Sequence, residues 1–286
     1  MSEEQVKKIV GMLKDFKQER NRGEGIDYRC GAKGKIAHII TNDLNSAWFE
    51  ILSEVMTAGR VYRIDKGSYE GEQRITSPVV VEIKYPQTRP LAPEVPDGVT
   101  PPTTNDKIEE YFIGYLTDPK AAPNEHYTYA QDLYWQIPWV IDHYKDAHGN
   151  AHCYMTVGRP ETLYHYDLNV DYGEVISVID RATDEEIAFY DKTNAWNRDP
   201  KNKPSSQCLR GIDTWIDESG LNFWVYFRSW DLLNGFSQNM GGIQLLKEMM
   251  AGEIGVNDGW LIASCKDLHV YDNVWIAALA RLGKVV

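Results

Sequence analysis

Residues 207–239 read QCLRGIDTWIDESGLNFWVYFRSWDLLNGFSQN, and this stretch predicts two strands followed by the start of a helix. Residues 211–216 and 221–227 are short runs rich in β-branched and aromatic residues, which predicts two strands. A helix follows, which we expect Ser237 to cap and Gly255 to close. Strands that lead into a long helix indicate a chain that mixes both kinds of structure.

The remaining predicted elements extend this mixture over the whole chain. Helical periodicity alternates with short β-branched runs, and six prolines punctuate a surface connection at 86–102. We expect one α+β domain over residues 1–286, with residues 163–205 as an insertion that leaves the core. The predicted helices are 2–20, 44–56, 133–144, 273–282 and one capped by Asn105 or Asp106 that continues through 108–116, and the further predicted strands lie in 79–83 and 151–157.

Charge and hydropathy exclude several classes of protein. The formal net charge is −12 and the pI is about 5.1, so a broad surface for nucleic acid or anionic membrane is not expected. No apolar run approaches the roughly 20 residues that span a bilayer, and the charged N-terminus is unlike a secretory signal. We therefore expect a cytoplasmic protein that holds any phosphate with a few local cations.

Cysteine usage points to thiols rather than to metal or disulfide chemistry. The four cysteines lie at wide intervals with no CxxC pair, so we expect free thiols and no metal site. Cys30, Cys153 and Cys265 are expected to be small buried hydrophobes. Cys208 lies among other reactive residues and is the candidate nucleophile.

Polar residues gather in four short motifs of the final third of the chain. They are QCLR at 207–210, FRSWD at 227–231, NGFSQN at 234–239 and DLHVY at 267–271. Each lies at the end of a predicted strand or at the start of a helix, where side chains are exposed on a rigid frame. We expect a functional site there.

In order and approximate spacing, these motifs resemble the signature of the thymidylate synthase family, and also that of the related pyrimidine nucleotide hydroxymethylases. The signature is a nucleophilic cysteine, an Arg-Ser-x-Asp turn, a glycine followed four residues later by asparagine, and a His-x-Tyr pair. The likeness is especially close to archaeal-type thymidylate synthases, in FRSWDLLNGF, IQLLKEMMAGEIGV and LHVYD. It implies a thymidylate synthase-like α+β fold, in which a large mixed sheet with flanking helices forms a homodimer interface.

The resemblance also implies the chemistry. Cys208 would add to C6 of a pyrimidine so that C5, otherwise a poor nucleophile, can attack an electrophilic carbon. A free thiol titrates near pH 8.5 or so, and nearby guanidinium groups lower that value. We therefore expect Arg228 to keep Cys208 ionised near neutral pH while it also binds the phosphate.

The other residues of the motifs receive nucleotide-binding roles by resemblance. Ser229 joins Arg228 on the phosphate, and Asn239 forms paired hydrogen bonds with N3 and O4 of the base. His269 and Tyr271 hold the sugar 3′-hydroxyl. The remaining two residues, Asp231 and Gly235, lie where base and folate meet. Because family members that act on cytosine tend to carry Asp at the asparagine position, Asn239 favours a uridine nucleotide.

Less specific motifs supply the remaining candidates. Glu110 resembles the glutamate that relays protons at O4, with Glu109 as the alternative register, and Tyr129 resembles the tyrosine that assists removal of the C5 proton. Lys66 and Arg74 are candidates for a further phosphate clamp.

The sequence departs from the family pattern in ways that bear on the reaction. Many members carry an arginine pair that crosses to the partner's phosphate, where this chain has Ala151-His152-Cys153, so Arg74 or Arg159 is expected to compensate. Only 15 residues follow Tyr271, which leaves out the tail that closes over folate. The tryptophans that help to receive hydride have no match between Leu116 and Tyr129.

Three hypotheses follow. The first is reductive methylation of dUMP with 5,10-methylene-tetrahydrofolate or a related pterin. The second is 5-hydroxymethylation of dUMP, dCMP or CMP without folate oxidation. The third is a non-catalytic nucleotide- or RNA-binding relative, against which Cys208 argues. The catalytic hypotheses require a pyrimidine nucleoside monophosphate and a homodimer, but no nucleic acid and no membrane.

Overall fold

The structure is a computed structural model that describes residues 36–65, 69–121, 127–158 and 207–284. The predicted helix at 2–20, the insertion at 163–205 and the single-domain boundary at either end lie outside these residues. Cys30, Lys66 and Arg159 lie outside them as well.

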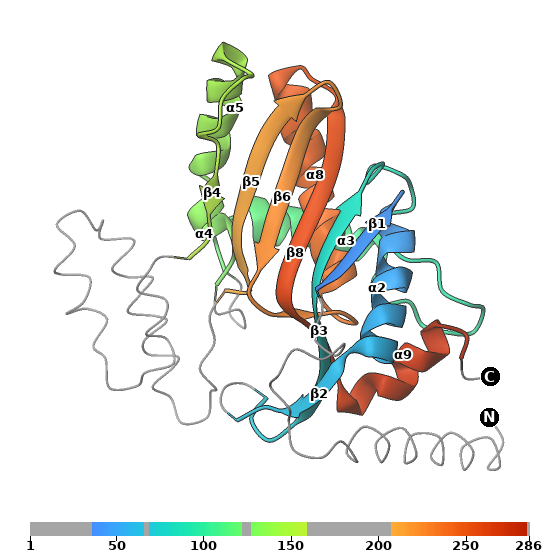
Figure 1. The fold of residues 1–286 in the computed structure, drawn as a ribbon. Coiled ribbons are helices and arrows are strands. Elements are labelled where there is room, and N and C mark those ends of the chain that lie inside the picture. Colours follow the sequence, from blue (N-terminus) through green and yellow to red (C-terminus); the bar gives the residue numbers. More distant parts are fainter. Residues whose placement is uncertain (1–35, 66–68, 122–126, 159–206, 285–286) are drawn as a thin grey trace, which may run out of the picture.

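The described chain folds as a mixed sheet with helices packed against it, which confirms the α+β class (Figure 1). Strand order is β1-β3-β8-β6-β5-β4, with β2 added to β3 and β7 added to β8. The strands are β1 Ala37–Thr41, β2 Arg60–Arg63, β3 Gln73–Ile83, β4 Met155–Thr156, β5 Leu209–Asp217, β6 Gly220–Phe227, β7 Trp230–Asp231 and β8 Asp258–Tyr271.

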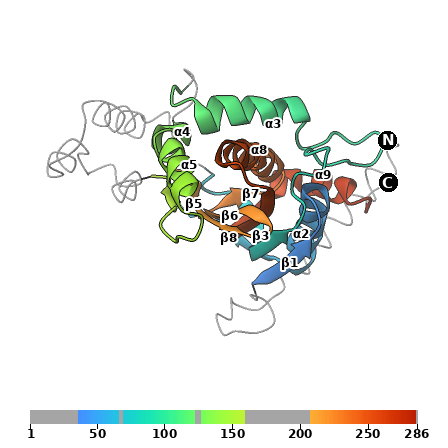
Figure 2. The same ribbon diagram turned by 90° about the horizontal axis from the view of Figure 1, so that it is seen from above.

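The helices gather on one face of this sheet. They are α2 Leu44–Ala58, α3 Asn105–Tyr111, a π-helix Phe112–Thr117, α4 Ala130–Leu133, α5 Gln136–Asp146, α8 Phe236–Ile254, a 3-10 turn Asp272–Val274 and α9 Trp275–Arg281. Helix α8 packs on β6 and β8, and α3 lies on its outer side (Figure 2). No described helix is long and apolar enough to cross a membrane.

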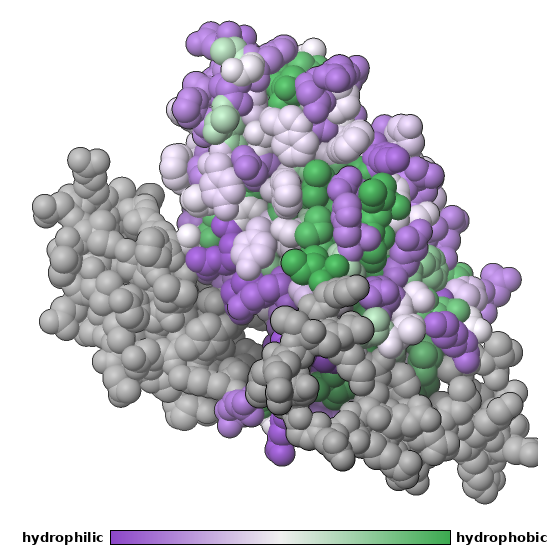
Figure 3. All heavy atoms as spheres, in the orientation of Figure 1, coloured by the Kyte–Doolittle hydropathy of each residue, from purple (hydrophilic) through white to green (hydrophobic). Residues whose placement is uncertain are grey.

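The opposite face of the sheet is uncovered by any described helix (Figure 1). Alternation along β6 explains the contrast between the two faces: Phe223, Val225 and Phe227 are buried under α8, whereas Trp224 and Tyr226 are exposed. Figure 3 views this open face, where pale and green side chains lie across the middle of the sheet.

The two predicted strands at 211–216 and 221–227 are confirmed as β5 and β6, which pair antiparallel. Two predicted caps are wrong. Thr104, rather than Asn105 or Asp106, accepts the capping hydrogen bond of α3. Helix α8 begins after Gly235, so Ser237 lies buried in its first turn. Gly255 closes α8 in the left-handed conformation, as predicted.

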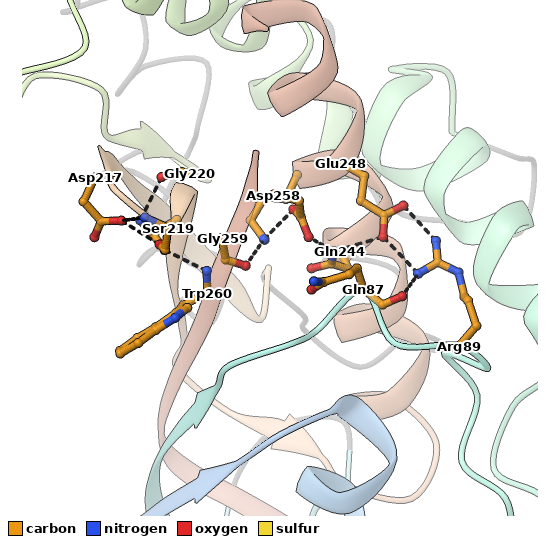
Figure 4. Close-up of polar contacts among 12 residues, drawn as sticks. Gln87, Arg89, Asp217, Ser219, Gly220, Gln244, Glu248, Asp258, Gly259 and Trp260 are labelled. Atoms are coloured by element: carbon orange, nitrogen blue, oxygen red, sulfur yellow. Dashed lines mark hydrogen bonds and ion pairs between the residues drawn. The ribbon is translucent and has the colours of Figure 1, made fainter. Parts of the chain in front are cut away.

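A polar network fixes the end of α8 to the start of β8, far along the sheet from the four motifs. The fully buried Lys247 donates from Nζ to Asp258 Oδ1 at 2.5 Å and to the Gly259 carbonyl at 2.6 Å. Burial lowers the pKa of Lys247, and Asp258 opposes that change. Gln244 and Glu248 continue the network outward to Arg89 (Figure 4).

Candidate active site

Sheet topology brings the four motifs to one edge. Because β6 and β8 are parallel, their carboxyl ends lie together, and β5 and β3 begin at the same edge because each is antiparallel to its neighbour. Cys208 therefore lies beside Arg228, whose N–H donates to the Cys208 carbonyl at 2.9 Å. Arg228 Nε also donates to the Gln207 carbonyl at 3.0 Å.

Asp267 on β8 is the centre of a hydrogen-bond cluster at this edge. Its carboxylate accepts from Arg74 Nη2 at 2.6 Å, Thr76 Oγ1 at 2.7 Å and Ser229 Oγ at 3.1 Å. Burial alone would raise the pKa of Asp267, but the positive charges nearby and these hydrogen bonds lower it. Arg74 and Ser229, both expected on phosphate, are thus brought to the site already paired with a carboxylate.

His269 is held in one tautomer. Its Nδ1 lies 2.9 Å from the Asp267 carbonyl, which can only accept, so Nδ1 carries the proton. Burial, aided by Arg74, lowers the pKa of His269 and favours the neutral ring. The buried Nε2 finds no hydrogen-bond partner among the described residues, so its lone pair is left unpaired there. That acceptor suits a sugar hydroxyl.

The thiol of Cys208 is partly buried, and the expected thiolate at neutral pH is not what the structure favours. Burial raises the pKa of Cys208; Arg228 and Arg74 lower it, while Asp267 and Asp231 raise it further. Arg228 does favour the anion, as expected, but its effect is smaller than that of desolvation. The thiol therefore stays protonated unless catalysis removes the proton.

Tyrosines line the side of the site that faces Cys208. The predicted Tyr129 lies there, and its hydroxyl oxygen accepts from the Leu209 N–H at 3.2 Å. Tyr127 and Tyr115 pack against it, with ring centroids 5.7 and 5.0 Å away. Burial raises the pKa of Tyr129 well above its usual value, and the nearby Cys208 adds to this effect. Tyr129 is thus a neutral phenol beside the thiol.

The structure turns both candidate glutamates away from the site. Glu109 and Glu110 lie on the exposed face of α3, whereas the next residue, Tyr111, is buried against α8. The Tyr111 hydroxyl lies near Asn239 and Cys208, and burial raises its pKa. It forms no hydrogen bond of ordinary geometry in the described residues. A helix presents residues of one face every three or four positions, so a shift by one residue exchanges the glutamate for the tyrosine.

Asn239 lies in the first turn of α8, beside β7. Its Oδ1 accepts from Trp230 Nε1 at 2.9 Å. A Cβ at Gly235 would lie 3.0 Å from the Asp231 carbonyl, a tighter approach than most Cβ atoms make, which favours glycine there. Asp231 accepts from the backbone N–H groups of Leu233 and Asn234 and so shapes the turn before α8. The expected role of Asp231, where base and folate meet, stays a prediction.

Tyr271 completes the predicted set at the end of β8. Its ring packs on Tyr69 with centroids 4.4 Å apart and on His269 at 4.7 Å. Of the expected structural cysteines, Cys153 and Cys265 are buried free thiols. No cluster of three or more His, Cys, Asp or Glu suited to a metal occurs in the described residues.

Sequence reasoning gave no role to Asp267, Thr76, Trp230 or Tyr111. A signal for Asp267 was present, since residues 267, 269 and 271 alternate and share one face of a strand. The role of Trp230 follows only from the approach of β7 to α8, which no local pattern encodes.

Known proteins resemble this chain in sequence and in fold. The model of the thymidylate synthase family matches residues 171–284. A protein of Methanosarcina acetivorans named "Putative thymidylate synthase" is 23% identical over 250 residues, which cover 85% of this chain and 94% of that protein. The structure of thermostable thymidylate synthase A from Bacillus subtilis superposes with a TM-score of 0.52 at 13% identity, covering 83% of this chain and 84% of the other.

The fold is therefore that of thymidylate synthase, an α+β fold whose reactive residues lie at one edge of a mixed sheet. The family model matches across the four motifs, so the predicted resemblance to the thymidylate synthase family is confirmed.

Proposed function

We propose that this protein transfers a one-carbon unit to C5 of dUMP, by reductive methylation, after Cys208 adds to C6. The observation that carries the proposal is the meeting of Cys208 and Arg228 with His269 and Asn239 at one sheet edge. The reactive sulfur, a guanidinium group and two groups suited to a sugar and a base all belong to the described chain.

The chain's own groups account for each requirement of the substrate. Arg228 favours the sulfur anion as the bond from Sγ to C6 forms, and the same guanidinium can meet the phosphate. The lone pair on His269 Nε2 can accept the sugar 3′-hydroxyl. After the carbon is attached, the C5 proton leaves and the bond from Sγ to C6 breaks, with Tyr129 beside the sulfur to assist.

Methylene-tetrahydrofolate or a related pterin would supply the electrophilic carbon and, for methylation, the hydride. The residues present fit such a neighbour at Gly235, where any side chain would press on the Asp231 carbonyl at 3.0 Å and on Asn239. Glycine is thus the residue that fits beside the amide that is assigned to the base.

A second candidate, 5-hydroxymethylation, is favoured by one observation. No tryptophan lies between Leu116 and Tyr129, where the resemblance places the residues that help to receive hydride. Tyr127 and Tyr129 stand on that side of Cys208 instead, and their hydroxyls are groups that can order water.

A homodimer through the open sheet face is part of the proposal. Trp224 and Tyr226 on β6 and Trp260 on β8 are 45%, 39% and 38% exposed on strands whose other face is buried. Large aromatic side chains gathered on an uncovered sheet are typical of a surface that pairs with another protein.

The test is release of tritium from C5-labelled dUMP in the presence of methylene-tetrahydrofolate. Both reactions release tritium, and Cys208→Ala abolishes the release. Oxidation of the folate and a methylated product support methylation, whereas a product with one additional oxygen and no folate oxidation supports hydroxymethylation. Absence of tritium release from labelled dUMP overturns both reactions on dUMP, and its absence from labelled dCMP and CMP as well overturns hydroxymethylation altogether.

A further inference from the structure

The amide of Asn239 is fixed in one orientation by Trp230, a neighbour to which no role has yet been given. Trp230 Nε1 lies 2.9 Å from Asn239 Oδ1. An indole nitrogen can only donate, so the amide must turn its oxygen, and not its nitrogen, toward Trp230. The indole therefore determines that the amide oxygen lies on the side of Trp230 and the amide nitrogen on the other side.

The indole itself cannot move aside. Trp230 is 3% exposed and stacks on Phe227, with ring centroids 3.7 Å apart and planes 7° from parallel. Phe236 packs on it at 4.6 Å. Because Trp230 also lies on β7, paired with Leu268 of β8, both its backbone and its ring are held.

Turning the amide over would place its NH₂ against the indole N–H. Two donors would then face each other in a partly buried setting, and each would lose its partner, which carries a penalty. The nearby Tyr111 hydroxyl does not set the orientation, because a hydroxyl can donate or accept. Of these two neighbours, Trp230 alone discriminates between the two orientations.

We propose that Trp230 is a specificity-determining residue: by holding the Asn239 oxygen it fixes the amide in a single order of acceptor and donor, which for the proposed substrate dUMP is the order that matches N3–H and O4 of uracil and rejects cytosine. The proposal rests on the proposed function. Uracil offers a donor at N3 and an acceptor at C4, whereas cytosine offers an acceptor at N3 and an amino donor at C4. An amide that can rotate by 180° can match either base. An amide whose oxygen is held by a hydrogen bond from Trp230 can match only one of them.

The experiment compares Trp230→Phe in two backgrounds, native Asn239 and Asn239→Asp. Binding of dUMP and of dCMP is measured by calorimetry for all four proteins, and tritium release from the C5-labelled nucleotides gives kcat/KM. In the native background the preference for dUMP over dCMP falls by about tenfold or more on loss of the indole donor. In the Asn239→Asp background the ratio changes less than in the native background, because an ionised carboxylate has two equivalent oxygens and no orientation to fix.

Each other outcome has a defined meaning. An unchanged ratio in Trp230→Phe, or an equal change in both backgrounds, overturns the proposal, since a packing defect acts alike on both. A native preference for dCMP overturns it too. Should Trp230→Phe not fold, Trp230→Met is the second variant without the donor. If binding behaves as expected but no tritium is released, the proposed reaction fails and this inference stands.

Discussion

At the scale of single residues, Cys208 lies under opposing influences. Desolvation raises the pKa of its thiol, and Arg228 is the largest influence in the other direction. The backbone bond from Arg228 N to the Cys208 carbonyl ties the two residues together, and the bond from Arg228 Nε to the Gln207 carbonyl holds the guanidinium group on this side. Reactivity of the thiol should therefore depend on this one side chain.

Arg228→Gln should slow alkylation of Cys208 by iodoacetamide at pH 8. Loss of the guanidinium raises the pKa of the thiol further, and each unit lowers the thiolate fraction about tenfold. Rates are measured from pH 7 to 10 in a Cys30→Ser background, where the described Cys153 and Cys265 are buried. Arg228→Lys keeps the charge, so its alkylation rate should lie between the rates of the native protein and of Arg228→Gln. A profile unmoved in Arg228→Gln would contradict this account.

Tyr111, rather than Glu110, should affect turnover. Glu110 lies on the exposed face of α3, so Glu110→Gln should leave tritium release within about twofold of native. Tyr111→Phe removes only the buried hydroxyl near Asn239 and should lower kcat about tenfold or more. The two adjacent variants control for each other. A large loss in Glu110→Gln would restore the glutamate to the role first expected.

At the scale of elements, α8 and β8 present site residues at one end and are joined to each other at the opposite end. The start of α8 and the end of β8 present Asn239 and His269 to the site, while the opposite ends are joined by Lys247 and Asp258. A buried lysine tied to the neighbouring strand fixes how far the helix lies along the sheet. The placement of the site residues should depend on that junction.

Lys247→Ala should reduce the free energy of unfolding by about 3–5 kcal/mol, because Asp258 loses its charge partner and a long stem leaves a cavity. Urea denaturation measures the change. Lys247→Met combined with Asp258→Asn should lose markedly less, since no charge is left unpaired. Arg89→Ala is the control: its pair with Glu248 is 49% exposed on the arginine side, so the loss should stay under about 1 kcal/mol.

At the scale of the whole molecule, the helices cover one face of the sheet, and Trp224, Tyr226 and Trp260 are exposed on the strands of the other face, where pale and green side chains lie among purple ones (Figure 3). If that face is the dimer interface, a charge at its centre should separate the subunits. Trp224→Asp should therefore sediment as a monomer at micromolar concentration in analytical ultracentrifugation, whereas the native protein sediments as a dimer.

Ile113→Asp is the matched control for this prediction. Ile113 is also apolar and is 62% exposed, but it lies on the π-helix, outside the strands of the sheet. It should leave the sedimentation coefficient of the dimer unchanged. A native protein that sediments as a monomer would contradict the expected interface outright.

The predictable part of the fold was the part with clear local patterns. Helix α2 and the strands β5 and β6 follow periodicity, and Gly255 ends α8 because glycine adopts the left-handed conformation without strain. The long strand β8 was not predicted, although it pairs with β3, β6 and β7. Its glycine, alanine, serine and cysteine weaken the strand signal, and pairing with neighbours supplies what propensity does not.

The candidate site also has a part that the sequence predicted and a part that it did not. Chemistry by residue type and order pointed to Cys208, Arg228, Asn239 and His269, and the sheet brings these motifs to one edge. The choice between Glu110 and Tyr111 depends on a helix rotation of one residue, which sequence patterns resolve poorly.

The sequence by itself determined the resemblance to the thymidylate synthase family, the candidate nucleophile and the order of the motifs, because these follow from residue types along the chain. Only the tertiary structure decided that Asp267 holds Arg74 and Ser229, that Tyr111 faces inward, and that Trp230 orients Asn239. The reason is physical: burial, hydrogen-bond direction and charge at a site depend on residues that are distant in the chain and meet only after strands pair and helices pack.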